Sequence, residues 1–319
     1  MRFVKADTPE GPRLGVLRDD DLVELSATES RLESHFGDDG EMLAQLGASI
    51  HAAPADEAAI DTLSLLRPVD PVAMRDFMVF EEHVLPSWRN AGMSRGPDVW
   101  YERPIGYLSN VANLLGPRDA VEIPGGSERL DFELEVGAIL GRAARSLTPE
   151  EAGAHVAGFL VLCDWSARDV QMREMDGRLG PFKGKDFASS LGAVFVTPDE
   201  LEDRKSGTGY DLLMTAQVND RVYGTDKWSS AYWSFEELVS YSSWNTCVEA
   251  GSLIGSGTCQ GGCILELSLR HGGDEYPWLA PGDQVSLSIE RLGDIRARVD
   301  APTRGAWPGV RADEGPRDP

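Results

Sequence analysis

The sequence has few cysteines, few histidines and few basic residues, and these shortages exclude several classes of protein. Four cysteines occur in 319 residues and none forms a C-x-x-C pair, so a zinc or redox motif of that type is not expected. Lysine and arginine number 30 against 53 acidic residues, which gives a formal net charge of −23. A chain this acidic repels nucleic-acid phosphates and anionic lipid, so neither is expected as a partner. Solubility alone explains such a charge, although some carboxylates could serve a metal.

Long apolar runs are also missing. The N-terminus, MRFVKADTPEG, has no apolar signal-peptide core, and no run approaches the length that spans a bilayer. We therefore expect a cytoplasmic protein with reduced thiols and no membrane partner. The 41% of hydrophobic residues is enough to bury a core, and the length predicts one large domain or two unequal ones.

Short β-type segments separated by Gly and Pro dominate the chain, so the predicted fold class is α+β and β-rich. We expect residues 1–68 to form a small β-rich unit with one helix near Met42–Ala53, and residues 69–303 to form the main, catalytic domain. Residues 304–319 are rich in Gly, Pro, Arg and Asp, which predicts a disordered tail.

Two helices of the main domain have clear start signals. Thr148 precedes Pro149, and Ser234 precedes Phe235, with acidic residues in each first turn. Thr and Ser are favoured N-caps, and Pro is favoured at the first helical position.

Three acids alternate with apolar residues in the segment D-F-E-L-E: Asp131, Glu133 and Glu135. Alternate side chains of a strand share a face, so these acids would repel one another unless they are solvated or share a cation. A solvated strand face is one interpretation. The other is a site for a hard divalent cation such as Mg²⁺, Ca²⁺ or Mn²⁺.

Asp164 follows an apolar strand, which places an acid where a buried strand ends. Arg168 and Gln171 come four and seven residues later, so a helix would stack all three on one face. The alternative is an N-cap Asp with an Arg partner. Lys185 lies in a Gly/Pro-rich loop and either enters a pocket or stays on the surface.

Asp76 and His83 are seven residues apart, a spacing that puts them on one face of a helix. The alternative is a helix-capping Asp with a satisfied His further on. Glu266 interrupts the apolar run Cys263–Leu267, which we predict to be a strand. An unpaired carboxylate there is costly, so His83 is its candidate partner, unless Glu266 faces outward.

Taken together, these segments resemble the fumarylacetoacetase family over about residues 70–290. The resemblance rests on the motifs P-I-G-Y, D-F-E-L-E, D-W-S-A-R-D-V-Q followed by L-G-P-F-K-G-K, S-G-T and I-L-E-L. It implies a fumarylacetoacetase-type mixed β-roll catalytic domain, a small N-terminal β-barrel-like domain, and a homodimer.

The resemblance also implies a divalent metal, Mg²⁺ before Ca²⁺ or Mn²⁺, and a role for each site residue. The implied metal ligands are Asp76, Glu133, Glu135 and Asp164; the implied general base is His83, oriented by Glu266; the pocket residues are Arg168, Gln171 and Lys185; the substrate contacts are Tyr107 and Thr258.

The implied activity is that of a hydrolase acting on carbon–carbon bonds in ketonic substances, with a use in aromatic catabolism. Its substrate would be a small 1,3-diketo acid, similar to fumarylacetoacetate or an acylpyruvate, cleaved through a His–Glu-activated water and a metal-stabilised enolate. A decarboxylase or isomerase of a small keto or hydroxydienoic acid is the alternative on the same scaffold. A non-catalytic Ca²⁺-binding or ligand-sensing module is the alternative from another class. Met78, Ala188 and Ser189 depart from the hydrolase pattern in the pocket, which favours a substrate other than fumarylacetoacetate itself.

Overall fold

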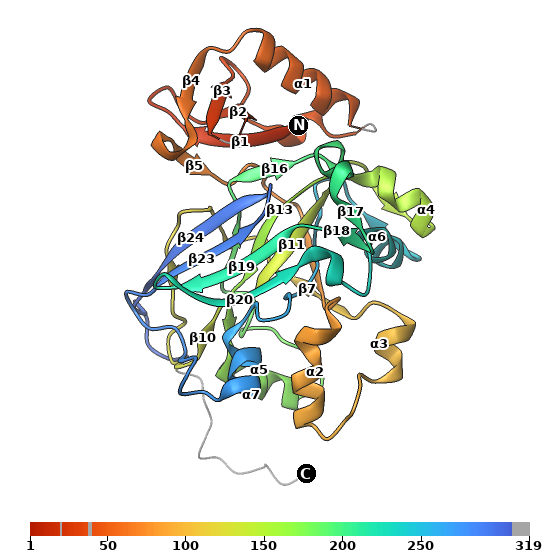
Figure 1. Cartoon of the computed structure of the whole chain (residues 1–319), viewed down its shortest axis with the longest axis vertical. Coiled ribbons are helices and arrows are strands. Elements are labelled where there is room, and N and C mark those ends of the chain that lie inside the picture. Colours follow the sequence, from red (N-terminus) through yellow and green to blue (C-terminus); the bar gives the residue numbers. More distant parts are fainter. Residues whose placement is uncertain (20, 38–39, 308–319) are drawn as a thin grey trace.

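Strands dominate the computed structural model, which describes residues 1–19, 21–37 and 40–307 (Figure 1). One sheet contains thirteen strands and a second contains five. The described helices are short, and α1 has twelve residues. This architecture confirms the β-rich α+β class predicted from the sequence.

The first 66 residues form a small unit at one end of the molecule (Figure 1). Its elements are β1 (Arg2–Asp7), β2 (Arg13–Arg18), β3 (Leu22–Leu25), α1 (Glu41–Ala52), β4 (Asp56–Ala59) and β5 (Ser64–Leu66). Strands β1 to β4 form an antiparallel meander. Leu43, Leu46 and Ile50 of α1 share a core with Phe3 and Leu14 of this meander. The helix expected near Met42–Ala53 is therefore confirmed.

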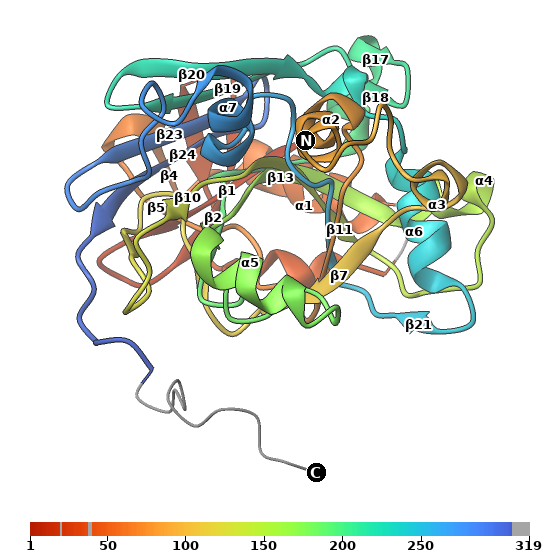
Figure 2. The same ribbon diagram turned by 90° about the horizontal axis from the view of Figure 1, so that it is seen from below.

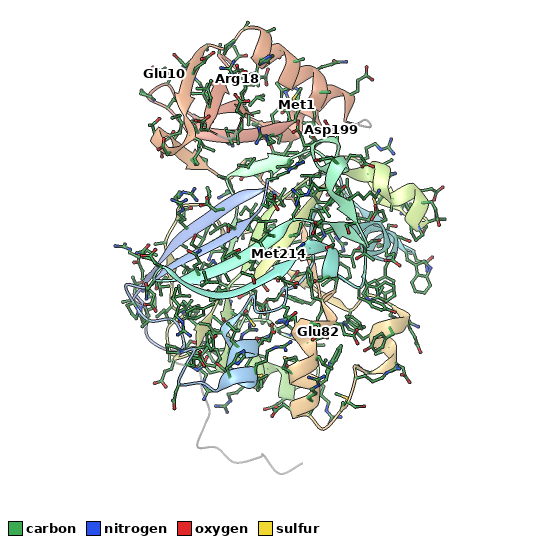
Figure 3. All side chains as sticks on the ribbon, viewed as in Figure 1. Met1, Glu10, Arg18, Glu82, Asp199 and Met214 are labelled. Atoms are coloured by element: carbon green, nitrogen blue, oxygen red, sulfur yellow. The ribbon has the colours of Figure 1, made fainter. Side chains whose placement is uncertain are left out.

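No strand pairing among the described residues closes this unit into a barrel. Instead, Arg2–Val4 of β1 pairs with β16 (Val194–Val196), so the unit continues the large sheet. Met1 and Asp199 lie at this junction (Figure 3), where the Met1 nitrogen is 3.4 Å from Asp199 Oδ2. The barrel-like shape is not confirmed, and the domain boundary at residue 68 stays a prediction.

The large sheet runs in the order β4-β3-β2-β1-β16-β13-β11-β22-β6-β7, with β5, β8 and β15 paired beside this path. Its further strands are β6 (Met74–Phe77), β7 (Gly106–Ser109), β8 (Leu114–Leu115), β11 (Leu134–Leu140), β13 (Val156–Asp164), β15 (Ser189–Leu191) and β22 (Leu253–Gly255). The second sheet has the order β20-β19-β23-β24-β9. Its strands are β9 (Val121–Glu122), β19 (Leu213–Val218), β20 (Arg221–Lys227), β23 (Gln284–Ile289) and β24 (Gly293–Asp300).

Strands β11 and β13 are covered on both faces. Val136 and Val161 belong to one core together with Leu287 of the second sheet. Ile139 and Leu160 belong to another core, which also contains the residues beneath α1. Double coverage requires a nearly continuous apolar run, and β11 has one, LEVGAIL, with every residue buried. The carboxylate of Glu135 within that run is therefore an exception that requires a specific partner.

The helices that follow the first unit are interspersed among the strands along the chain. They are α2 (Glu81–Asn90), α3 (Asp98–Glu102), α4 (Pro149–Ala152), α5 (Arg168–Asp176), α6 (Phe235–Ser243) and α7 (Ile264–His271). Helices α4 and α6 begin with the predicted N-caps, and Thr148 and Ser234 each form a capping box with the Glu three residues on. Viewed from below, α2, α5 and α7 surround the ends of β11 and β13 (Figure 2).

Helix α7 contradicts the strand predicted around Glu266. Cys263 is its N-cap, and Asp131 accepts hydrogen bonds from the backbone N–H groups of Ile264 and Leu265, at 2.7 and 3.0 Å. A carboxylate at a helix N-terminus satisfies orphan donors and interacts favourably with the helix dipole. The helix start is thus stabilised by a residue 133 positions away along the chain.

The remaining elements are small. Paired short strands are β10 (Leu130–Asp131) with β14 (Ser166–Ala167), β12 (Ala144–Arg145) with β21 (Cys247–Val248), and β17 (Lys205–Ser206) with β18 (Gly209–Tyr210); the 3-10 turns are Leu32–His35, Ile60–Thr62, Gly153–His155, Pro198–Arg204 and Trp228–Ser230. Within the described ranges, no helix is both long enough and apolar enough to cross a membrane. Most of the predicted tail, residues 308–319, lies outside the described residues.

Candidate active site

Four carboxylates from three strands of the large sheet meet in its interior. Asp76 comes from β6, Glu135 from β11 and Asp164 from the end of β13, and Glu133 lies directly before β11. Each residue offers one oxygen, and these atoms all lie within 4.8 Å of one another. All four residues are at most 6% exposed. Burial excludes the solvated strand face as an interpretation of Glu133 and Glu135.

Sheet register explains why these distant residues meet. Strand β22 pairs with both β11 and β6, and Gly255 lies opposite Gly137 on one side and Asp76 on the other. A side chain at Gly255 would overlap the Asp76 carboxylate, so glycine leaves room for that group. The next turn adds a donor, since the backbone N–H of Gly257 donates to Glu135 Oε2 at 3.0 Å.

Two buried cations contact the acidic cluster. Lys185 Nζ donates to Glu133 and, at 2.7 Å, to Asp164. Arg168 donates from Nη2 to Glu133 at 2.7 Å and from Nε to Asp131 at 2.8 Å. Both cations are 3% exposed, so the surface-lysine interpretation of Lys185 is wrong.

The two cations lower the pKa of one carboxyl in the cluster much more than those of the others. Burial opposes ionisation of Glu133, but Lys185 and Arg168 outweigh it and lower the pKa of that carboxyl to about 2. Burial, and then the charge of Asp164, raise the pKa of Asp76 to about 7. Burial, and then the charge of Asp76, raise the pKa of Glu135 well above its usual range. Asp76 and Glu135 therefore retain protons because the two cations do not neutralise the whole cluster.

The residues present fit a divalent cation. Glu135 Oε1 is buried, and no N–H group donates to it. Its carboxyl hydrogen-bonds that of Asp76 only while one of the two keeps a proton, so ionisation of both leaves this oxygen unpaired. A buried, unpaired carboxylate oxygen is costly, and a cation at the cluster would remove that cost. The donor set consists of carboxylate oxygens, which suit Mg²⁺, Ca²⁺ and Mn²⁺ better than softer ions.

Stability of the chelated protein should fall as pH rises between about 4 and about 7. The Asp76 carboxyl keeps its proton when folded up to about pH 7 but ionises near its ordinary value of 3.8 when unfolded. Its stabilising contribution is therefore complete below pH 3.8 and is lost as pH rises through about 7, at about 1.4 kcal/mol per pH unit for each proton. The free energy of unfolding in urea is measured at each pH with EDTA and with saturating Mg²⁺. The difference between the two values isolates the cluster, since titrating groups elsewhere contribute equally to both. A Mg²⁺ stabilisation that does not grow with pH in this window would contradict the assignment.

His83 lies beside the cluster and is held by Glu266. Its Nδ1 is 2.9 Å from Glu266 Oε2, with side-chain exposures of 15% and 1%. A ring nitrogen of His83 also lies within 4.8 Å of an oxygen of Glu133. Glu266 further accepts from Gly261 N–H and Arg270 Nε, both at 2.7 Å, so it is fixed independently of the imidazole. The structure therefore brings together the pair that the sequence suggested, with Glu266 on α7.

Two local predictions about this region are wrong. Asp76 and His83 do not share a helix, because Asp76 is in β6 and α2 begins at Glu81. Asp164 does not stack with Arg168 on a helix either, since Asp164 ends β13 and Arg168 begins α5. The N-cap alternatives for Asp76 and Asp164 are also contradicted. Each of these side chains comes from a different strand or helix, and tertiary packing brings them together. A rule based on helical spacing therefore does not apply to them.

The remaining predicted residues lie nearby with unequal contacts. Tyr107, from β7, donates its hydroxyl hydrogen to Asp164. Gln171 Oε1 accepts from Arg168 Nη1 at 3.0 Å. Thr258 is buried directly after the turn that contacts Glu135. Tyr107 and Lys185 also line a cavity of about 370 Å³, together with Leu108, Ser109, Asn110, Pro181, Phe182 and Asp186.

Two residues that the sequence marked have other contacts than expected. The alternation predicts that Asp131 shares a strand face with Glu133 and Glu135, but it lies outside the cluster. The chain breaks between β10 and β11, and Asp131 instead anchors Arg168 and caps α7. Ser189, marked as a changed pocket position, places its Oγ 3.4 Å from Asp164 Oδ1, a contact that follows from its position opposite Asp164 in the β13–β15 pair.

Comparison with known proteins agrees with this geometry. Residues 73–300 match the family described as Fumarylacetoacetate (FAA) hydrolase C-terminal. A fumarylacetoacetase from Arabidopsis thaliana is 28% identical over 291 residues, which cover 73% of this chain and 69% of that protein. A mitochondrial oxaloacetate tautomerase from Homo sapiens is 29% identical over 198 residues, covering 62% of this chain and 59% of that protein.

Solved structures share the fold. The crystal structure of a probable 2-hydroxyhepta-2,4-diene-1,7-dioate isomerase from Mycobacterium abscessus has a TM-score of 0.69 and 23% identity, covering 95% of this chain and 100% of that one. At this identity the likeness shows the fold alone. The family match, in contrast, spans more than half of the sequence and includes the acidic cluster and His83. The relatives above are named fumarylacetoacetase and oxaloacetate tautomerase. This chain therefore belongs to the fumarylacetoacetate hydrolase family.

Proposed function

We propose that this chain is a metal-dependent hydrolase that cleaves a carbon–carbon bond of a small 1,3-diketo acid similar to fumarylacetoacetate or an acylpyruvate. The observation that carries the proposal is the His83–Glu266 pair beside four buried carboxylates. A proton acceptor fixed next to a cation site is the arrangement that water activation requires.

Asp76, Glu133, Glu135 and Asp164 would hold the cation, with Mg²⁺ first and Ca²⁺ or Mn²⁺ as alternatives. When bound, it would act as a Lewis acid that polarises the substrate's carbonyl oxygens. Lys185 and Arg168 would keep Glu133 ionised for this purpose, since they lower its pKa to about 2.

His83 would take a proton from water, and the resulting hydroxide would add to a carbonyl carbon of the substrate. The bond between that carbon and the neighbouring carbon then breaks, giving a carboxylic acid and an enolate that takes a proton to become a ketone. Glu266 would hold the imidazole in one tautomer and stabilise its positive charge. Lys185, at the wall of the cavity beside Tyr107, would stabilise the enolate. Gln171 and Thr258 are proposed as pocket residues on the resemblance alone.

A decarboxylase, tautomerase or isomerase on the same scaffold is the second candidate, and the named tautomerase relative favours it. In an isomerase, His83 would move a proton between carbon atoms instead of taking it from water. The contacts of Glu266 with His83 and Arg270 favour the hydrolase over the decarboxylase, because a decarboxylase needs no oriented base. An isomerase or tautomerase would use the same base, so the substrate screen separates it from the hydrolase.

A substrate screen separates these activities. Purified protein with Mg²⁺ is tested against acylpyruvates, fumarylacetoacetate-like diketo acids and oxaloacetate, while the enol absorbance is followed and the products are identified by mass. We expect two smaller acids or ketones from a diketo acid, with one water added. A product of unchanged mass, or carbon dioxide release, would replace the hydrolase with the second candidate. The homodimer and the cytoplasmic location stay predictions.

A further inference from the structure

Cys263 lies beside the proposed base and has no role in the chemistry described above. It is fully buried at the start of α7. Its Sγ, a ring nitrogen of His83 and a carboxylate oxygen of Glu133 all lie within 4.8 Å of one another. This trio mixes sulfur, nitrogen and oxygen, whereas the four-carboxylate cluster offers oxygen alone. The two groups of side chains should therefore prefer different cations.

We propose that Cys263, His83 and Glu133 form a second cation site, selective for thiophilic divalent ions such as Zn²⁺ or Cd²⁺. Thiolate sulfur and imidazole nitrogen are the ligands that such ions favour, while Mg²⁺ favours oxygen. Bond lengths in zinc sites are about 2.3 Å to sulfur and about 2.0–2.1 Å to nitrogen, so side-chain shifts of roughly 1 Å bring the three atoms into range.

The surroundings of His83 resemble the usual support for a metal-bound imidazole. Its Nδ1 faces Glu266 Oε2 at 2.9 Å, so coordination of a cation through Nε2 would leave this contact in place. Metal-binding histidines commonly donate their other N–H to a carboxylate, which fixes the ring and strengthens the ligand. Glu266 is in turn fixed by Arg270 at 2.7 Å. The imidazole is therefore already oriented for coordination.

Cys263 can supply a thiolate when a cation arrives. Its sulfur accepts the backbone N–H of Glu266 at 3.4 Å, at the N-terminus of an eight-residue helix. Burial raises the pKa of the thiol well above its usual range, so the resting side chain is neutral. The cation must replace the thiol hydrogen, which leaves to solvent as a proton while the sulfur–metal bond forms. Glu133 supplies negative charge that it already shares with Lys185 and Arg168.

Occupation of this site would block the proposed reaction, because a bound cation uses the nitrogen of His83 that would otherwise take a proton from water. This expected inhibition rests on the proposed function, but the binding does not. Binding is therefore measured first, without substrate.

The test is a Cd²⁺ titration of the full chain with saturating Mg²⁺, followed by the ultraviolet charge-transfer band of a cadmium–thiolate bond. We expect the band to grow to one equivalent of Cd²⁺ and to be absent from Cys263→Ser. Serine keeps an oxygen acceptor for the Glu266 N–H, so the start of α7 is preserved. Cys247→Ser is the matched control, since Cys247 is the exposed cysteine, and it should retain the band. Loss of the band in Cys247→Ser, or its persistence in Cys263→Ser, would overturn the proposal.

A second variant covers the case in which Cys263→Ser does not fold. His83→Gln should keep the circular dichroism spectrum and weaken Cd²⁺ binding by at least about tenfold, the size of effect typical for metal-site partners. Unchanged Cd²⁺ affinity in this folded variant would exclude the site. Inhibition by Cd²⁺ is then measured within each variant as the ratio of the rates with and without Cd²⁺, so that differences in basal rate between variants do not affect the comparison. A Cd²⁺ band in a protein that turns over no diketo acid would refute the proposed hydrolase and leave the cation site standing.

Discussion

Replacing His83 with alanine should lower kcat by about 10²–10⁴-fold, the usual cost of losing a general base, while Mg²⁺ binding stays intact. His83 does not belong to the four-carboxylate cluster, so its removal leaves the oxygen ligands of Mg²⁺ in place. Steady-state kinetics on the substrate found by the screen, together with calorimetric titration of Mg²⁺, measures both quantities. Near-normal turnover would remove the hydrolytic assignment.

The chain contains a matched control for this variant. His51 Nδ1 lies 2.7 Å from Glu24 Oε2, and Glu24 is 1% exposed, so this pair has the same atoms and a similar distance as the His83–Glu266 pair. It lies in the N-terminal unit, on α1 and β3. His51→Ala should therefore leave kcat unchanged. A loss similar to that of His83→Ala would show that breaking any His–Glu pair impairs the fold.

Removal of divalent metal should abolish activity, and Mg²⁺ or Mn²⁺ should restore it. A metal ion that polarises a carbonyl contributes several kcal/mol to the transition state, so the expected loss is on the order of 10²-fold or more. Activity is measured after exhaustive chelation and after stepwise addition of each ion. Full activity in the chelated protein would contradict the ligand assignment.

Glu135→Gln tests the same assignment within the chain. It removes the carboxylate whose buried Oε1 accepts from no N–H group, and it should raise the Mg²⁺ concentration for half-maximal activity by at least about tenfold. Asp169→Asn is the control, because Asp169 belongs to the same conspicuous motif as Asp164 but contacts Ser127 and Glu128 instead of the cluster. Its Mg²⁺ requirement should be unchanged.

Local signals predicted the parts of the fold that local interactions determine. The capping boxes at Thr148 and Ser234 satisfy backbone donors within one turn. All residues of each box therefore lie close together in the sequence, where they can be recognised. The prediction of a strand at α7 is wrong because a short apolar run such as Cys263–Leu267 suits a buried strand as well as a helix. The residue that caps it, Asp131, is remote in the sequence. A helix start that depends on a tertiary contact leaves no nearby signature.

The site shows the same division. Glu133 and Glu135 could be paired from strand alternation, and the unusual Glu266 pointed to a partner such as His83. The contact of Asp76 with Asp164 depends on the order of β6, β22, β11 and β13 in the sheet, which no spacing rule supplies. The roles of the site residues came from family resemblance, and they stay predictions until the variants are measured.

The pairing of β1 with β16 has a consequence for any shortened form of the protein. Removing the unit would leave the backbone groups of Val194–Val196 without their partner strand. An unprotected strand edge is a template for pairing with other chains. Truncation at residue 68 is therefore a route to aggregates, because β1 of the first unit is the strand that protects this edge of β16.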